Sequence, residues 1–169
     1  EVAPVYNPVT HQVAVYHEYG SRVYWAYSND HGASWSGNTE VSGIGAISAA
    51  PSAVYYQPSG GAYDTLLAVR DSSGNGKVFG VKNGAVVSTV LSFGSLQGRP
   101  YLMDDQGSDG SDYIYLIYAS SGKVAPDNKE YTPLTRKMDK STAIWDPYIY
   151  QNVKLPPDLP DGDTGYYWY

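Results

Sequence analysis

The 169-residue sequence contains no cysteine, which excludes disulfides and thiol chemistry. The longest basic cluster is the pair Arg136-Lys137 and the net charge is −6, so we expect no nucleic-acid partner, because phosphate binding needs a basic face. No apolar run approaches the ~18 residues of a transmembrane helix, so we expect no membrane span. The sequence starts at Glu1 rather than Met, which we interpret as a processed start and an indication of secretion to the extracellular space.

Phenylalanine and methionine are also scarce, with two of each, whereas the sequence contains 18 Tyr, 4 Trp, 18 Gly and 11 Pro. Tyrosine suits a half-buried pleated surface, and glycine and proline mark turns. No long apolar stripe has helical spacing, and short alternating runs dominate instead. The sequence therefore predicts an all-β fold. The clearest runs are residues 12–16, 22–27, 65–70, 77–81 and 113–118.

A proline opens a short apolar run four times, at Pro4, Pro51, Pro100 and Pro147, with spacings of 47, 49 and 47 residues. A period near 40–50 residues with several short strands in each unit is typical of propeller blades. We therefore expect antiparallel four-stranded propeller blades, about three plus one extra strand. The expected strands are 4–7, 12–18, 22–28 and 34–41, then 52–57, 64–70, 77–82 and 85–92, then 100–104 and 112–119.

The predicted blade region is 1–154, with units at 1–46, 47–95 and 96–146 and a fourth unit that starts at 147. Residues 155–169 form a Pro/Asp-rich and aromatic tail. Propellers close with at least about four blades, so this ring is incomplete unless another chain completes it. A homo-oligomer, further blades of a longer chain, or donation of the strand at 147–152 to a neighbour would solve this problem. A β-sandwich with coincidental proline spacing is the alternative fold.

Residues 28–35, Ser-Asn-Asp-His-Gly-Ala-Ser-Trp, fit the pattern S-x-D-x-G-x-[ST]-W at every position. The segment resembles the Asp-box, or bacterial neuraminidase repeat, of sialidases and related propellers. The resemblance implies a structural hairpin turn between the third and fourth strands of a blade. In such a turn Asp30 accepts backbone N–H bonds, Gly32 takes a positive φ and Ser34 bonds back to the loop. Ser28 completes the box, and Trp35 is expected to pack under the turn.

A second resemblance starts at Trp35. Residues 35–43 and 47–54 are similar to the blade junction of bacterial and fungal propeller lectins, which run from a Trp-containing strand through a small-residue–Pro step into the next blade. This resemblance covers about twenty residues and implies a sugar-binding function.

A sialidase needs three arginines, a Tyr–Glu pair and an acid/base Asp. In this chain such residues are too few and too poorly placed to match the sialidase pattern. The four arginines and four glutamates lie in contexts that indicate no catalytic role. We expect no catalytic residues and lean towards a protein that is not an enzyme. The alternative is that the chain is a fragment of a sialidase-type glycoside hydrolase.

An acidic stretch contains Asp104, Asp105, Asp109 and Asp112, whose oxygens are of the type that ligates Ca²⁺. The spacing does not match an EF-hand loop, and a solvated acidic hairpin turn is the simpler interpretation. We expect no cofactor and no metal site.

Sugar binding requires an aromatic ring that stacks on the sugar and a few polar groups nearby. We predict a secreted, lectin-like carbohydrate-binding module whose partner is a glycan. The alternative from another class is a structural subunit that assembles by strand exchange. The candidate ligand-binding residues share an aromatic or guanidinium side chain in or near a strand: Tyr24, Trp25, Tyr55, Tyr56, Arg70, Arg99 and Tyr101.

Overall fold

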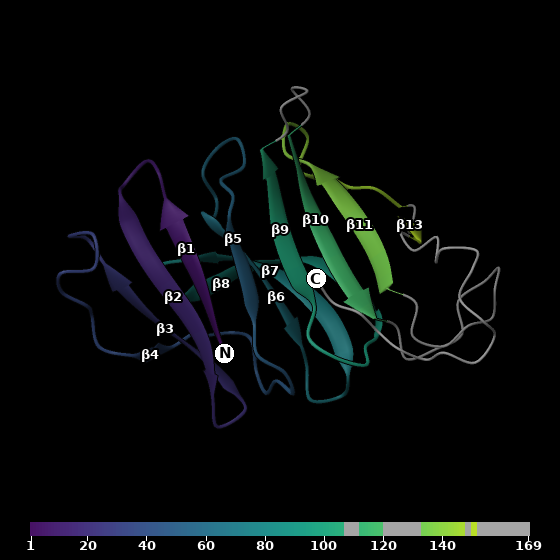
Figure 1. Cartoon of the computed structure of the whole chain (residues 1–169), viewed down its shortest axis with the longest axis horizontal. Coiled ribbons are helices and arrows are strands. Elements are labelled where there is room, and N and C mark those ends of the chain that lie inside the picture. Colours follow the sequence, from purple (N-terminus) through teal and green to yellow (C-terminus); the bar gives the residue numbers. More distant parts are fainter. Residues whose placement is uncertain (107–111, 120–132, 148–149, 152–169) are drawn as a thin grey trace, which may run out of the picture.

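The computed structural model describes residues 1–106, 112–119, 133–147 and 150–151. Within these residues every regular element is a strand, and no helix is long and apolar enough to cross a membrane. The strands form three antiparallel sheets that fan out side by side along the molecule (Figure 1). The prediction of an all-β fold is confirmed.

The first sheet has the order β1-β2-β3-β4. Its side chains alternate between buried and exposed along β1, which is the pattern of a strand with one covered face. Gly20 and Ser21 join β2 to β3 with φ values of 57° and 61°, as a two-residue hairpin turn requires. The strands are β1 (Val2–Asn7), β2 (Gln12–Tyr19), β3 (Arg22–Ser28) and β4 (Thr39–Glu40).

The second sheet has the order β5-β6-β7-β8. Asn83 and Gly84 join β7 to β8 with φ values of 50° and 72°, so the predicted hairpin turn is confirmed. The strands are β5 (Ser52–Tyr55), β6 (Thr65–Arg70), β7 (Asn75–Lys82) and β8 (Ala85–Ser95).

The third sheet has the order β9-β10-β11-β12, and β13 also pairs with β11. Here β12 pairs only with Met138 and Asp139, at one end of β11. The other end of β11 remains available as an edge, and β13 pairs there with Leu134 and Thr135. The strands are β9 (Tyr101–Gln106), β10 (Asp112–Ala119), β11 (Pro133–Asp139), β12 (Ile144–Trp145) and β13 (Tyr150–Gln151).

The predicted strands of the first two sheets agree with the structure, with β4 shorter than expected. The fourth unit that was expected to start at 147 stays a prediction; the two described residues of β13 pair with β11 in the third sheet. The other unit boundaries remain predictions, although the twelve strands before β13 lie inside the three predicted units. The tail 155–169 lies outside the described residues.

Two hydrophobic clusters hold the three sheets together. Along β6, Leu67 and Val69 belong to the cluster shared with the first sheet, whereas Leu66 and Ala68 belong to the cluster shared with the third. All four side chains are fully buried. The middle sheet is therefore covered on both faces by its neighbours, as stacked propeller blades require.

The first strands of the three sheets, β1, β5 and β9, lie side by side in chain order (Figure 1). This arrangement resembles the inner strands of propeller blades. The alternative of two sheets facing each other in a sandwich is wrong, because there are three sheets and the middle one packs on both others.

Residues 28–35 form a tight turn between β3 and β4 that has the predicted hydrogen bonds. The Asp30 carboxylate accepts bonds from the Ser34 amide (2.8 Å) and the Ser34 hydroxyl (2.5 Å). The Ser28 hydroxyl donates to Asp30 Oδ1 and accepts from the Gly32 amide, each at 2.7 Å. Gly32 has a φ of 90°, in the region that glycine favours.

Trp35 contacts this turn differently from the prediction. Its indole N–H donates to the Gly32 carbonyl (3.1 Å), but the side chain is 47% exposed rather than packed beneath the turn. Ser36 then returns to β3 through its amide and its hydroxyl, both bonded to the Tyr27 backbone. This side-chain contact replaces strand pairing, which explains why β4 starts only at Thr39.

The turn predicts a specific acid sensitivity. The Ser34 hydroxyl, the Ser34 amide and the Ser28 hydroxyl all donate to Asp30 and lower its pKa from 3.8 to about 2. A depressed native pKa stabilises the fold above about pH 4, and this contribution is lost as the pH falls towards about 2. We expect the thermal midpoint of Asp30→Asn to decrease less than that of wild type as the pH falls from about 4 to about 2. Ser34→Ala should show an intermediate decrease. Parallel acid profiles for wild type and Asp30→Asn would contradict this prediction.

Candidate functional site

An open cleft of about 620 Å³ lies at one end of the junction between the second and third sheets. Tyr55 and Gln57 contribute from the end of β5, and Lys140 contributes from the turn after β11. The other lining residues come from the β1–β2 turn, from the position after β5, from β9, from the start of β10, and from the end of β11 and the turn after it. These are Pro8, Tyr56, Asp104, Asp112, Tyr113, Asp139 and Ser141.

An ion-pair network forms one wall of this cleft. The Lys140 ammonium contacts both the Asp104 carboxylate and the Asp112 carboxylate, the latter at 2.5 Å, and its side chain is only 15% exposed. Burial works against its charge, but hydrogen bonds to the two carboxylates prevail and raise the pKa of Lys140. Lys140 therefore stays protonated and holds the ends of β9 and β10 together.

This network bears on the idea that Asp104 and Asp112 ligate Ca²⁺. The two carboxylates do converge, but the Lys140 ammonium occupies the position between them that a cation would take. Asp109 lies outside the described residues. Within the described part of the chain, no group of three or more His, Asp or Glu side chains is arranged to hold a metal ion.

In the wild-type protein the Lys140 ammonium occupies the position between the Asp104 and Asp112 carboxylates. We expect Lys140→Ala to vacate this position and so to create a cation site. The substitution leaves two facing carboxylates, so the free energy of unfolding should fall by about 1 kcal/mol. Millimolar Ca²⁺ should then raise the thermal midpoint of Lys140→Ala and leave that of wild type unchanged. The double variant Lys140→Ala/Asp104→Asn is the control, because it should lose the response to Ca²⁺. No response in the single variant would contradict this account.

The remaining polar groups of the cleft are held in place by local bonds. The Asp139 carboxylate accepts bonds from the Ser141 amide (2.8 Å) and hydroxyl (2.6 Å), and these bonds lower the pKa of Asp139. The Tyr55 hydroxyl donates to the Gln57 side chain (3.1 Å). The Tyr56 hydroxyl donates to the Lys140 carbonyl (2.9 Å) and so ties the second sheet to the third. The cleft is thus preorganised by contacts within the chain.

The structure brings two of the predicted ligand-binding residues together at this cleft, Tyr55 and Tyr56. Tyr55 is partly exposed there, whereas Tyr56 is buried and acts mainly as a brace. Sequence reasoning missed Gln57, Asp139 and Lys140 as site residues. The acidic residues Asp104 and Asp112 could have indicated this site from the sequence. Lys140 could not, because it reaches them only through the pairing of strands that lie far apart in the sequence.

Two other predicted residues have structural contacts. Trp25 is buried between the first and second sheets, and its ring stacks on Tyr27 with a centroid distance of 5.0 Å. Arg70 donates to the Leu96 carbonyl and to the Ser48 hydroxyl, each at 2.9 Å. Both lie outside the cleft.

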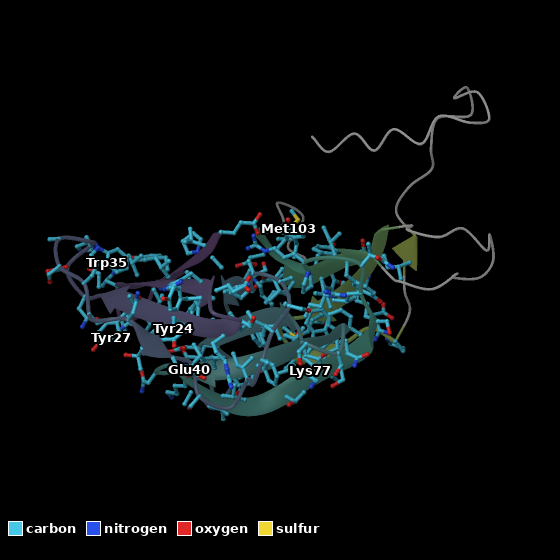
Figure 2. All side chains as sticks on the ribbon, turned by 90° about the horizontal axis from the view of Figure 1, so that it is seen from below. Tyr24, Tyr27, Trp35, Glu40, Lys77 and Met103 are labelled. Atoms are coloured by element: carbon cyan, nitrogen blue, oxygen red, sulfur yellow. The ribbon has the colours of Figure 1, made fainter. Side chains whose placement is uncertain are left out.

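The last three predicted residues lie on other surfaces. Tyr24, labelled in Figure 2, is on the face of the first sheet that no described residue covers. Its ring stacks on that of His17. Tyr101 is exposed on the third sheet beneath the Arg99 guanidinium. Arg99 also bonds to Glu1 and to the Pro51 carbonyl, and so links the starts of all three sheets.

The junction between the first and second sheets has no comparable opening. The space there, lined by Asn7, Gln12 and Asp64 among others, is only about 10 Å³, because Tyr16 and Trp25 fill it. Burial raises the pKa of Tyr16 to about 12, which agrees with a dry junction. The two junctions within the chain therefore differ, and only the one beside the third sheet is open to a ligand among the described residues.

The four arginines do not share a partner. Arg22 pairs with Glu40, and Arg136 donates to the Tyr118 hydroxyl, whereas Arg70 and Arg99 bond to backbone carbonyls at separate sheet junctions. A carboxylate clamp made from three arginines is therefore not present among the described residues.

Comparisons with known proteins give a likeness in fold. No protein-family model matches the sequence, and no curated protein matches it. Among solved structures, the chain is similar to a fucose lectin from Kordia zhangzhouensis that was determined in complex with methyl-fucoside. The TM-score is 0.53 and the sequence identity is 11%, over 89% of this chain and 97% of the lectin chain. The match gives no support to a sialidase relationship. The chain has a lectin-like fold of three antiparallel sheets that resemble four-stranded propeller blades, the third of which also contains the short strand β13.

Proposed function

We propose that the protein is a lectin-like carbohydrate-binding module without catalysis, and that the cleft between the second and third sheets binds a neutral glycan. The observation that carries this proposal is the composition of the cleft, which combines the Tyr55 side chain with carboxylate and amide groups. Tyrosine rings stack on the apolar face of a sugar, and planar polar groups bond to its hydroxyls. The lectin-like fold supports the same function.

The charge of the cleft favours a neutral ligand. Asp104, Asp112 and Asp139 contribute three carboxylates, and Lys140 is the one cation among the lining residues. An acidic sugar such as a sialic acid would meet a net negative wall, which disfavours its binding. A fucoside is a reasonable first ligand to test, since it is neutral and carries an apolar methyl group that suits a tyrosine ring.

A glycan array with the soluble 169-residue chain tests the proposal, with Tyr55→Ala as the cleft variant. We expect binding to neutral glycans and a loss of about tenfold or more in affinity for Tyr55→Ala, equal to about 1.4 kcal/mol. Tyr19→Ala is the matched control, because Tyr19 is 72% exposed in the β2–β3 turn region and does not line the cleft. An array without binding, or equal losses in both variants, would contradict the proposal.

The sequence-based predictions of location and partners are also part of this proposal. An extracellular location suits a glycan-binding module, and fractionation of a producing culture would test it. A homo-oligomer or further blades of a longer chain remain the proposed partners besides a glycan. The alternative of assembly by strand exchange has little support, because β13 pairs with β11 of its own chain. A sialidase-type fragment has little support either, since the arginines contact separate partners.

A further inference from the structure

The first sheet has one face that no described part of the chain covers. Its buried face contains Ala3 and Val5, which belong to the cluster shared with the second sheet. The opposite face is apolar along β1, where Val2 and Tyr6 are 61% and 48% exposed, and it also contains His17 of β2, opposite Val2. We call this the first outer face. The strand register places these residues on it: Val2, Pro4, Tyr6, Val13, Val15 and Tyr24.

The third sheet has the same property on its other side. Leu102 and Leu116 face the second sheet within the shared cluster. On the opposite face, Tyr101 is 45% exposed and Met103, which Figure 2 labels, is 54% exposed. The register pairs Tyr101 with Ile117 and Met103 with Tyr115, so these four apolar side chains form one patch, which we call the third outer face.

The repeat shows that these two faces are counterparts. The residue after the proline that opens each sheet is Val5, Ser52 or Tyr101. Val5 faces the second sheet, and the Ser52 hydroxyl accepts a bond from the Leu102 amide of the third sheet (2.9 Å). By the same rule Tyr101 should face a following sheet. The first outer face likewise corresponds to the face of the second sheet that packs against the first sheet.

We propose that a second copy of this chain supplies that following sheet, so that the third outer face of each copy packs on the first outer face of the other. The contact would continue the side-by-side series of β1, β5 and β9 with β1 of the partner. Closed propellers contain about four to eight blades, so three sheets are too few, two copies give six, and three copies give too many. The dimer would therefore be a two-fold ring with two identical junctions.

Light scattering on the full 169-residue chain tests this proposal. We expect a mass of about twice 18.4 kDa for wild type. Val15→Glu on the first outer face and Met103→Glu on the third should each give a folded monomer, because a charge would be buried in both junctions. Val87→Glu, at an exposed position on β8 of the second sheet, is the control and should stay dimeric.

Mixing the two monomeric variants distinguishes this pairing from a contact between identical faces. Each variant keeps the face that the other has lost, so an equimolar mixture should regain one junction and a mass above that of the monomer. A monomeric wild type, a mass other than two copies, variants that remain dimeric with native circular dichroism spectra, or a mixture that stays monomeric would overturn the proposal.

Discussion

Replacing Gly84 with alanine should lower the free energy of unfolding by about 3 kcal/mol, which corresponds to a fall of about 6–12 °C in thermal midpoint. Gly84 lies in the β7–β8 turn with a φ of 72°, which a residue with a Cβ rarely adopts. A Cβ at this position would also overlap the indole of Trp25. The second-sheet turn thus rests directly on the first sheet.

Gly94→Ala is the matched control, because Gly94 lies in β8 and a Cβ there would meet no atom within 4 Å. We expect its midpoint to stay close to that of wild type. The comparison can be made by thermal unfolding followed by circular dichroism. Equal midpoints for the two variants would show that the first and second sheets do not stack as described.

Replacing Arg99 with alanine should have the second-largest effect on stability, about 2 kcal/mol. The guanidinium donates to the Pro51 carbonyl (2.6 Å) and pairs with Glu1 (2.5 Å), and its side chain is only 16% exposed. It therefore links the starts of β1, β5 and β9, and its removal leaves a carbonyl without its donor. Arg99→Lys should recover only part of the loss, since one ammonium cannot reproduce the planar fork.

The control for Arg99 is Arg22→Ala. Arg22 pairs with Glu40 at 3.5 Å, and both side chains are 47% exposed, so this pair should contribute less than about 0.5 kcal/mol. Denaturant unfolding of the three variants gives the comparison. A loss in Arg99→Ala no larger than that in Arg22→Ala would contradict the role of Arg99 as a link between sheets.

The sequence predicted the strands where local signals are strong. The runs 12–16 and 65–70 and the Asn83-Gly84 turn depend on neighbouring residues alone, and the structure confirms the two strands and the turn. The strand β11 was missed, because it follows an irregular stretch and begins with a proline. The role of β13 was also missed, since its pairing depends on the edge that the short β12 leaves open.

The candidate site could be predicted only in part, for a related reason. Tyr55 was identified because aromatic residues in strands with polar neighbours suit a sugar, but the same argument selected Trp25. Alternation along β3 places Trp25 with Val23 on the buried face, and this signal was available in the sequence. Lys140 reaches Asp104 and Asp112 only through the pairing of β9, β10 and β11, which no local pattern encodes.

The most direct test of the central claim is an amide NMR titration of the isotope-labelled chain with the neutral glycan that binds best on the array. If the glycan occupies the cleft, the largest shifts should fall on Gln57, Asp112 and Lys140, from both sheets that form it, while Tyr19 and Trp35 should stay in place. Shifts confined to one sheet away from these residues, or no shifts at saturating glycan, would contradict a sugar site at the junction of the second and third sheets.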